Sequence, residues 1–392
     1  MAKNERILVG FTVLNTILSV FTYFNIAYNG IGEKLFAGKI GIVAFILYIL
    51  VLLVYGTPKC YNQSYKKYSI LLSFTFLFIW FLTWDSSGQI ENFYIIAIVY
   101  VGSFVMFRDD LKIKCFEWFI RVFALILAVA LIEYVIYSVT GLGVVLYSSI
   151  YRPGDNTVVL SQLMFNLLTD TDTSFLFRFQ CLSEEPGVIG TVCGFLIFLV
   201  RDNKKYKREY IIFLIAGFLS FTLAFYAMFL IHIVNLNSLK IRNIILIFAT
   251  IVLGIIYFGD LIDEFLLYRI VGKDIVDIDN RSGSDFAVQF NKALKNGSLW
   301  LSNYNKGYNI NGAGLKMFIW RYGILSLIVL FLSYTYVYYD EAKRHKSLSW
   351  GSLLFFIAYW ISFYQRHYVT NMEYVVCFFI APLIFVRMKQ KI

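Results

Sequence analysis

The segment Arg178–Gly190 contains the residues whose types and spacing are best suited to chemistry. It reads Arg-Phe-Gln-Cys-Leu-Ser-Glu-Glu-Pro-Gly-Val-Ile-Gly and leads into an apolar run. Ser183 or Glu184 can cap a helix there, and Pro186 fits its first turn. The positive end of such a helix, next to an arginine, is suited to binding an anion. The simpler interpretation is a capped helix start with one surface arginine.

A second arginine has the same arrangement further along the chain. Arg281 precedes a predicted helix that has Ser284 as its N-cap and Asp285 in its first turn, and that stops at Asn296-Gly297. Two arginines, each beside a helix N-terminus, favour a site for a doubly charged group such as a pyrophosphate.

Other ionisable residues extend this candidate site, and each also has a structural interpretation. Glu133 lies in an apolar stretch, where carboxylates face a cavity or a partner more often than lipid. Arg321 also lies in an apolar stretch and suits either a substrate cavity or an ion pair. Three further candidates are Arg152 and Arg366, as phosphate contacts, and His367, as a base or an ordinary solvated histidine.

The composition indicates what kind of chain positions these residues. Hydrophobic residues make up 59% and charged residues 15% of the 392, against about 25% charged in an average soluble domain. The apolar residues form blocks of roughly the 17–25 residues that cross a hydrocarbon core. This excludes a soluble globular enzyme, a disordered chain and a nucleic-acid-binding domain. We predict an all-α polytopic membrane protein with a single integral membrane domain.

The apolar blocks predict about twelve transmembrane helices. The run 210–234 is ambiguous: one helix gives about eleven spans, whereas a hairpin broken near Gly217–Ser220 gives about twelve. The other predicted spans are about 7–28, 40–55, 69–84, 93–107, 116–140, 186–200, 242–258, 314–338, 350–365 and 372–387.

The positive charges favour the hairpin. With both termini in the cytoplasm, most Lys and Arg residues of the short loops fall on the cytoplasmic side, as membrane proteins prefer. If 210–234 were a single helix, the cluster Lys343, Arg344 and Lys346 would move outside. The net charge of +10 is therefore explained by topology and predicts no nucleic-acid partner.

This topology leaves two large outer loops, about 143–185 and about 259–313. Loops of this length usually carry function or are disordered, and neither has a disordered composition. The first contains an amphipathic stretch, Val158–Leu168, suited to lying at the membrane interface. The second contains the predicted helix that follows Arg281. We therefore expect short helices in the outer loops.

The chain offers little that could hold a metal ion. Its five cysteines have no Cys-x-x-Cys spacing and its three histidines are scattered. Asp170 and Asp172 form an Asp-Thr-Asp in the first outer loop, which is the main exception. We predict no metal and no cofactor.

Two segments resemble a known family. Arg178, a few residues ahead of Glu185–Gly187 at a helix start, resembles the Arg and Glu-Pro-Gly segment of many Wzy-type O-antigen and capsule polymerases. Arg281 with its short helix, followed by Asn311–Gly314 and Arg321–Gly323, resembles that family's second loop and following helix. The number of spans, the two outer loops and the Phe-, Tyr-, Ile- and Asn-rich composition are similar along the whole chain. One departure is that the second loop here has no histidine.

The resemblance implies a GT-C-type glycosyltransferase that joins undecaprenyl-pyrophosphate-linked repeat units into O-antigen or capsular polysaccharide. Arginines can neutralise the pyrophosphate leaving group without a metal, and the acceptor hydroxyl needs a base. The expected phosphate ligands are Arg178, Arg281, Arg321, Arg152 and Arg366. The expected catalytic candidates are Glu185, Glu184, Glu133 and His367, with Glu373 as a further carboxylate.

The implied partners are the lipid-linked donor and acceptor, membrane lipids and a chain-length regulator protein. The implied location is the bacterial cytoplasmic (inner) membrane, with the site facing the periplasmic side. Two alternatives stay open. One is an O-antigen ligase, which the missing histidine disfavours, and the other is a lipid-linked oligosaccharide flippase, which the long loops and few deep charges disfavour.

Overall fold

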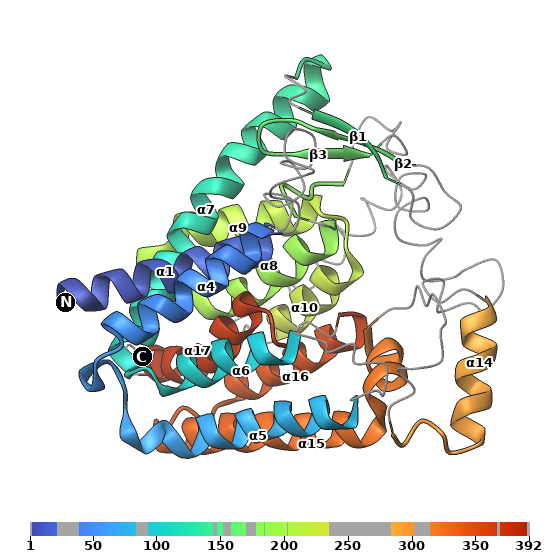
Figure 1. Cartoon of the computed structure of the whole chain (residues 1–392). Helices are drawn as coiled ribbons and strands as arrows, with labels where there is room; N and C mark the ends of the chain where they lie inside the picture. The colour runs from blue at the N-terminus through green and yellow to red at the C-terminus, as the bar shows by residue number, and fades with distance from the viewer. Residues whose placement is uncertain are drawn as a thin grey trace.

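A computed structural model describes residues 2–21, 39–83, 93–143, 147–151, 158–169, 178–183, 185–201, 203–234, 284–301, 314–366 and 369–389. These ranges form a mostly helical bundle (Figure 1). Its helices are α1 (Lys3–Val20), α4 (Lys39–Tyr55), α5 (Lys66–Leu82), α6 (Phe93–Met106), α7 (Asp109–Thr140), α8 (Pro186–Val200), α9 (Lys207–Leu219), α10 (Leu223–Val234), α14 (Ser284–Lys295), α15 (Gly314–Arg344), α16 (Trp350–Gln365) and α17 (Met372–Lys389). Short 3₁₀ turns span Pro58–Cys60, Gln63–Tyr65 and Lys204–Tyr206.

Three of the described helical segments are long and apolar enough to cross a membrane: Gln63–Leu82, Asp109–Thr140 and Gly314–Arg344. Five shorter apolar helices lie beside them, in α4, α6, α8, α10 and α17. Most of the predicted spans coincide with these helices, whereas the predicted span 242–258 lies outside the described residues. A helix satisfies its backbone hydrogen bonds internally, which suits such apolar sequences.

The run 210–234 forms two helices, as the charge pattern predicted. α9 ends at Leu219 and α10 begins at Leu223. Between them Ser220 Oγ donates to the Gly217 carbonyl at 2.6 Å, and Phe221 adopts a left-handed φ of 46°. The two arms are antiparallel, because Tyr210 near the start of α9 lies 3.2 Å from His232 near the end of α10. The helical hairpin is confirmed.

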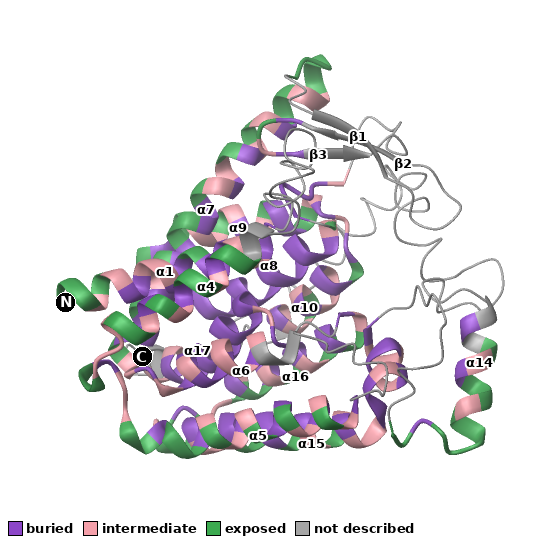
Figure 2. Cartoon of the chain, viewed as in Figure 1, coloured by how far each residue is buried: buried purple, intermediate pink, exposed green. Residues whose placement is uncertain are grey.

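α8 and α17 form the centre of the bundle. Every residue of α8 from Gly187 to Val200 is buried, and α17 contacts α1, α6, α7, α8, α15 and α16. Figure 2 shows both helices almost wholly in the buried class. Because other helices surround α8 and α17, the residues at the ends of these two helices are held in fixed positions.

A row of glycines lets neighbouring segments of the protein approach α8 closely. A Cβ at Gly190 would lie 2.0 Å from the Thr222 side chain, and one at Gly194 would lie 2.3 Å from Met228. Thr222 immediately precedes α10 and Met228 lies in the middle of it, so these glycines bring the α9–α10 turn and α10 itself against α8. Small residues serve close helix packing in this way.

The segment 143–185, predicted as the first outer loop, contains strands where short helices were expected. β1 (Tyr147–Tyr151), β2 (Val158–Gln162) and β3 (Leu167–Thr169) form an antiparallel sheet in that order. The expectation of short helices in this segment, as part of an all-α fold, is therefore wrong here. The β-branched residues of β2 favour strands, and pairing on both sides satisfies its backbone groups.

The segment 259–313, predicted as the second outer loop, contains the predicted helix. α14 runs from Ser284 to Lys295, and Gly297 has the positive φ of 69° that ends a helix. Ser284 is its first helical residue rather than a residue before it. Figure 1 shows α14 running across the direction of α5 and α15, beyond the end at which α15 begins.

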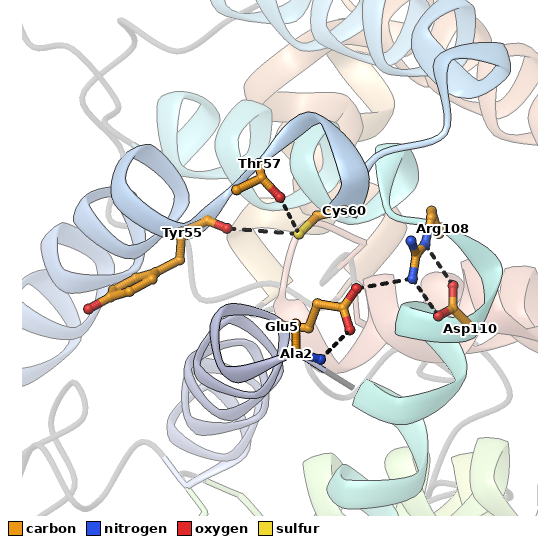
Figure 3. Close-up of polar contacts among 7 residues, drawn as sticks. All are labelled: Ala2, Glu5, Tyr55, Thr57, Cys60, Arg108 and Asp110. Atoms are coloured by element: carbon orange, nitrogen blue, oxygen red, sulfur yellow. Dashed lines mark hydrogen bonds and ion pairs between the residues drawn. The ribbon is translucent and has the colours of Figure 1, made fainter.

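Two ends of the bundle differ in charge. At one end, which we call the basic end, ion pairs join the starts of α1, α5 and α7 to one another and to the end of α15. Figure 3 shows one of them, in which Arg108 donates to Glu5 at 3.1 Å and also pairs with Asp110. Cys60, in the same view, packs against Tyr55 and Thr57. The opposite end, where α8, α15 and α17 begin, is called the far end below.

Candidate functional site

Four of the predicted site residues lie outside the described residues: Glu184, Arg152, Arg281 and His367. The remaining ones are Arg178, Glu185, Glu133, Arg321 and Arg366. Two of these, Glu185 and Arg366, form an ion pair at the start of α8, and Arg178 bonds to the α9–α10 turn that packs on Gly190 of the same helix. Glu133 and Arg321 occupy separate places, described below.

Glu185 and Arg366 form an ion pair at the start of α8. Arg366 Nη2 lies 2.5 Å from Glu185 Oε2, and Arg366 ends α16 with only 4% of its side chain exposed, against 50% for Glu185. The guanidinium also lies on Gly187, where a Cβ would be 1.9 Å from Nη2. A buried guanidinium needs a charged partner, so α8 can begin here only with a carboxylate and a glycine in these places.

The predicted capping of α8 is partly wrong. Pro186 is the first residue of the helix, as predicted, but the N-cap is Glu185 rather than Ser183 or Glu184. Glu185 makes no side-chain capping bond and faces Arg366 instead. Ser183 is buried, and its Oγ has no hydrogen-bond partner within the described ranges. The ion pair between Glu185 at the start of α8 and Arg366 at the end of α16 takes the place of a side-chain cap.

Arg178 is fixed to the turn between α9 and α10. Phe179 N–H donates to the Leu219 carbonyl at 2.9 Å, and Arg178 Nε donates to the Ser220 carbonyl at 3.4 Å. The side chain of Ser220 in turn packs on Gly190 of α8, where a Cβ would be 2.6 Å from its Oγ. Arg178 is therefore bonded to a turn that packs on Gly190, about one helical turn along α8 from Gly187, which Arg366 contacts.

Glu133 anchors the first outer loop to α7. Its carboxylate accepts the backbone N–H groups of Met164 and Phe165, each at 2.9 Å, and Asn166 Nδ2 at 2.8 Å. These donors belong to the turn between β2 and β3. Both carboxylate oxygens are thus engaged in holding the loop, which is the structural interpretation of this residue.

Arg321 lies on a short segment rather than inside a continuous helix. The prediction placed it in a span 314–338, but α15 is interrupted at Gly323, whose φ is 84° and ψ 161°. Arg321 therefore precedes the long apolar part of α15. The sequence signal for this interruption was the Gly323 that follows Arg321-Tyr322.

Glu373, the further carboxylate candidate, ties α17 to α1. It is fully buried in the first turn of α17 and accepts a hydrogen bond from Ser19 of α1. Met372 N–H donates to the same Ser19 oxygen at 3.2 Å. This carboxylate lies within the bundle.

The described residues contain no group of three or more His, Cys, Asp or Glu that could hold a metal ion. Asp170 and Asp172 lie outside those residues. The start of α8 carries the Arg366 guanidinium and the Glu185 carboxylate, and Arg178 bonds to the turn that packs on this helix. Guanidinium groups can bind and neutralise a phosphate group by charge-assisted hydrogen bonds.

This chain matches no family model, no curated protein and no solved structure. The family resemblance of its two segments therefore stands on the quoted residues alone. The pairing of Glu185 with Arg366 was not expected from the sequence, because 181 positions separate them along the chain. The sequence predicted Glu185 and Arg366 separately as site residues, but it contained no signal that links one to the other.

Proposed function

We propose that this chain is an integral membrane glycosyltransferase that joins undecaprenyl-pyrophosphate-linked repeat units into O-antigen or capsular polysaccharide. The observation that carries the proposal is the Glu185–Arg366 ion pair at the start of α8, with Arg178 bonded to the turn that packs against the same helix. Glu185 belongs to the segment that resembles the Wzy-type polymerases, and Arg366 is a predicted phosphate ligand from a distant helix.

In this proposal each side chain has a separate task. Arg178 and Arg366 hold oxygens of the pyrophosphate and oppose the charge that develops as the sugar–oxygen bond breaks. Glu185 orients Arg366 in the resting state, and on donor binding the phosphate takes over that guanidinium. The released carboxylate is then placed to take the proton of the acceptor hydroxyl.

The arrangement of helices supports the proposed twelve-span topology with the far end outside. The basic end carries the Lys and Arg residues expected in the cytoplasm, and α1 begins and α17 ends there (Figure 1). α10 ends near the basic end, whereas α15 begins at the far end against the α16 backbone. The predicted span 242–258 is the crossing that this arrangement requires. The proposed location is the bacterial cytoplasmic membrane, with the site on the periplasmic side.

The test is glycan profiling of a deletion strain complemented with single variants. Arg178→Ala, Arg366→Ala and Glu185→Gln should each abolish long-chain glycan while single repeat units remain on the surface. A loss of about 3 kcal/mol of transition-state stabilisation slows the reaction by about two orders of magnitude. The matched control is Arg121→Ala, an exposed arginine of α7, which should give the wild-type ladder.

Membrane protein levels must stay equal among the variants, as measured by immunoblot. Long-chain glycan from both arginine variants would exclude the proposed site. Loss of single repeat units as well, in the deletion strain itself, would exclude a polymerase and point to a flippase.

A further inference from the structure

The interruption of α15 at Gly323 has a conformation that other residues cannot adopt. A φ of 84° with a ψ of 161° belongs to a region occupied essentially by glycine. A Cβ there would also lie 2.8 Å from the Trp300 carbonyl oxygen and 2.8 Å from Leu301 C, both backbone atoms that cannot rotate away. The interruption is therefore fixed by two independent constraints.

The segment Leu299–Leu301 is called the clasp below. Its backbone carbonyls accept hydrogen bonds that carbonyls of α15 itself would accept in a continuous helix. Ile324 N–H donates to the Leu299 carbonyl at 2.8 Å, and Leu325 N–H donates to the Trp300 carbonyl at 3.3 Å. In a continuous helix these two N–H groups would bond to the carbonyls four residues earlier, those of Trp320 and Arg321. The carbonyls of Leu299 and Trp300 thus take the place of the Trp320 and Arg321 carbonyls at the interruption of α15.

The clasp is held by a small hydrophobic cluster of its own. Leu299 is fully buried against Phe286 and Phe290 of α14 and against Trp320 of α15. The aromatic ring of Phe286 lies 5.5 Å from that of Trp320 in an edge-on arrangement. α14, the clasp and the short segment 314–322 are therefore packed together.

The other end of this short segment is fixed near the ion pair of the candidate site. Gly314 has a φ of 50°, and a Cβ there would lie 2.1 Å from the Tyr364 carbonyl oxygen. The neighbouring backbone of Gln365, also within 2.7 Å, leads directly into Arg366. Two glycines in backbone-to-backbone contact thus bracket the segment that carries Arg321.

We propose that Gly323 is a positioning residue which, with the clasp, breaks α15 so that Arg321 is held at the far end as a further ligand of the lipid-linked pyrophosphate. This inference rests on the proposed function. An unbroken α15 would rotate and shift the segment 314–322 relative to α16, and the position of Arg321 would change with it.

The first measurement tests the clasp without reference to any reaction. In full-length protein in nanodiscs, Gly323→Ala should raise hydrogen exchange in peptides covering Ile324 and Leu325 at least tenfold. Leu299→Ala, which removes the buried side chain but keeps Gly323, should also raise it. Its matched control is Leu301→Ala, because Leu301 has the same side chain but is 56% exposed. Gly10→Ala controls for the glycine change, since nothing lies within 4 Å of its Cβ.

The second measurement tests positioning, with undecaprenyl pyrophosphate as the probe. Gly323→Ala and Leu299→Ala should each weaken its affinity roughly tenfold, as expected for a lost bond to a charged group. In an Arg321→Ala background the same changes should have no further effect, because the residue they position is absent. A purely structural role would weaken binding equally in both backgrounds.

The outcomes separate the two proposals. Unchanged exchange at Ile324 and Leu325 in both variants, or raised exchange with unchanged affinity, would overturn the positioning role and leave the proposed function in place. Failure of the wild-type protein to bind undecaprenyl pyrophosphate would overturn the proposed function, and the assignment of Arg321 with it. If Gly323→Ala does not fold, the Leu299 and Leu301 pair decides the question.

Discussion

At the scale of single residues, the far end is organised by glycines as much as by charges. The guanidinium of Arg366 lies directly against Gly187. The α9–α10 turn that holds Arg178 lies against Gly190, and the end of α16 lies against Gly314. In each case the side chain of any other residue would occupy the place of a neighbour. The arginines can approach α8 because these positions have no side chain.

Gly187→Ala should therefore act like a change of Arg366 itself. Its Cβ would lie 1.9 Å from the Arg366 Nη2 atom, so the guanidinium must leave Glu185 or α8 must move. We expect loss of long-chain glycan comparable to Arg366→Ala, with a destabilisation of about 1–3 kcal/mol from overpacking. Gly10→Ala, with nothing near its Cβ, should change neither quantity. Glycan ladders and thermal unfolding in detergent measure both, and a wild-type ladder from Gly187→Ala would contradict the arrangement.

At the scale of elements, the basic end is joined by a buried polar cluster between α5, α7 and α15. Lys112 and Glu341, both almost completely buried, form an ion pair of 3.1 Å. Tyr65 donates to Asp109 at 2.6 Å, and its hydroxyl lies 3.1 Å from His345 Nε2. Buried pairs of this kind are weak evidence for stability, but breaking one of them is costly.

His345 makes this junction sensitive to pH. Burial lowers the pKa of His345 below its usual value, and the charges of Lys112 and Arg344 act in the same direction, against the opposing effect of Asp109. The folded state therefore binds fewer protons than the unfolded state. Its contribution to stability is fully present above about pH 6.5 and is lost as the pH falls below that value.

We expect the free energy of unfolding to fall between pH 7 and pH 5 by up to about 1.4 kcal/mol for each unit by which the pKa is lowered. His345→Gln should remove this part of the slope, because glutamine does not titrate. His232→Gln is unsuitable as a control because that side chain is buried in α10. Denaturant unfolding at several pH values gives the slope, and an identical slope in the variant would exclude His345 as its source.

Local signals predicted most of the elements, and long-range contacts were beyond them. The apolar blocks and the charge count indicated the α9–α10 hairpin, and a cap residue with a following Gly297 indicated α14. The strands at 147–169 were missed because a short amphipathic stretch fits either periodicity. The Glu185–Arg366 pair depends on the packing of α8 against α16, which no local pattern encodes.

At the scale of the whole molecule, the two ends of the bundle carry different sets of charged residues. Lys112, Lys205 and Arg344 lie at the basic end with acidic partners around them. At the far end, Arg366 pairs with Glu185, and Arg178 bonds to the α9–α10 turn. Such an asymmetry fixes the orientation of a membrane protein when it is inserted.

Reporter fusions test that orientation. A fusion near Ser238, beyond α10, should score as cytoplasmic, and one near Asn305, between the clasp and α15, as external. The reason is that α10 ends near the basic end and α15 begins at the far end. Paired alkaline phosphatase and green fluorescent protein fusions give opposite signals on the two sides. A cytoplasmic signal at Asn305 would contradict both the twelve-span topology and the proposed site.

The complete burial of α8 also affects how deep its first turn lies. A helix that touches lipid must match the hydrocarbon thickness or tilt to meet it, but α8 contacts protein from Gly187 to Val200 and has no such requirement. Its 15 residues are about 22 Å long, against about 30 Å of hydrocarbon. In the proposed orientation, with its last turn at the cytoplasmic surface, its first turn would lie below the outer edge of the hydrocarbon core. The headgroup of the proposed lipid-linked substrate would then have to enter the protein below the membrane surface to reach Arg366, while its isoprenoid chain stays in the membrane.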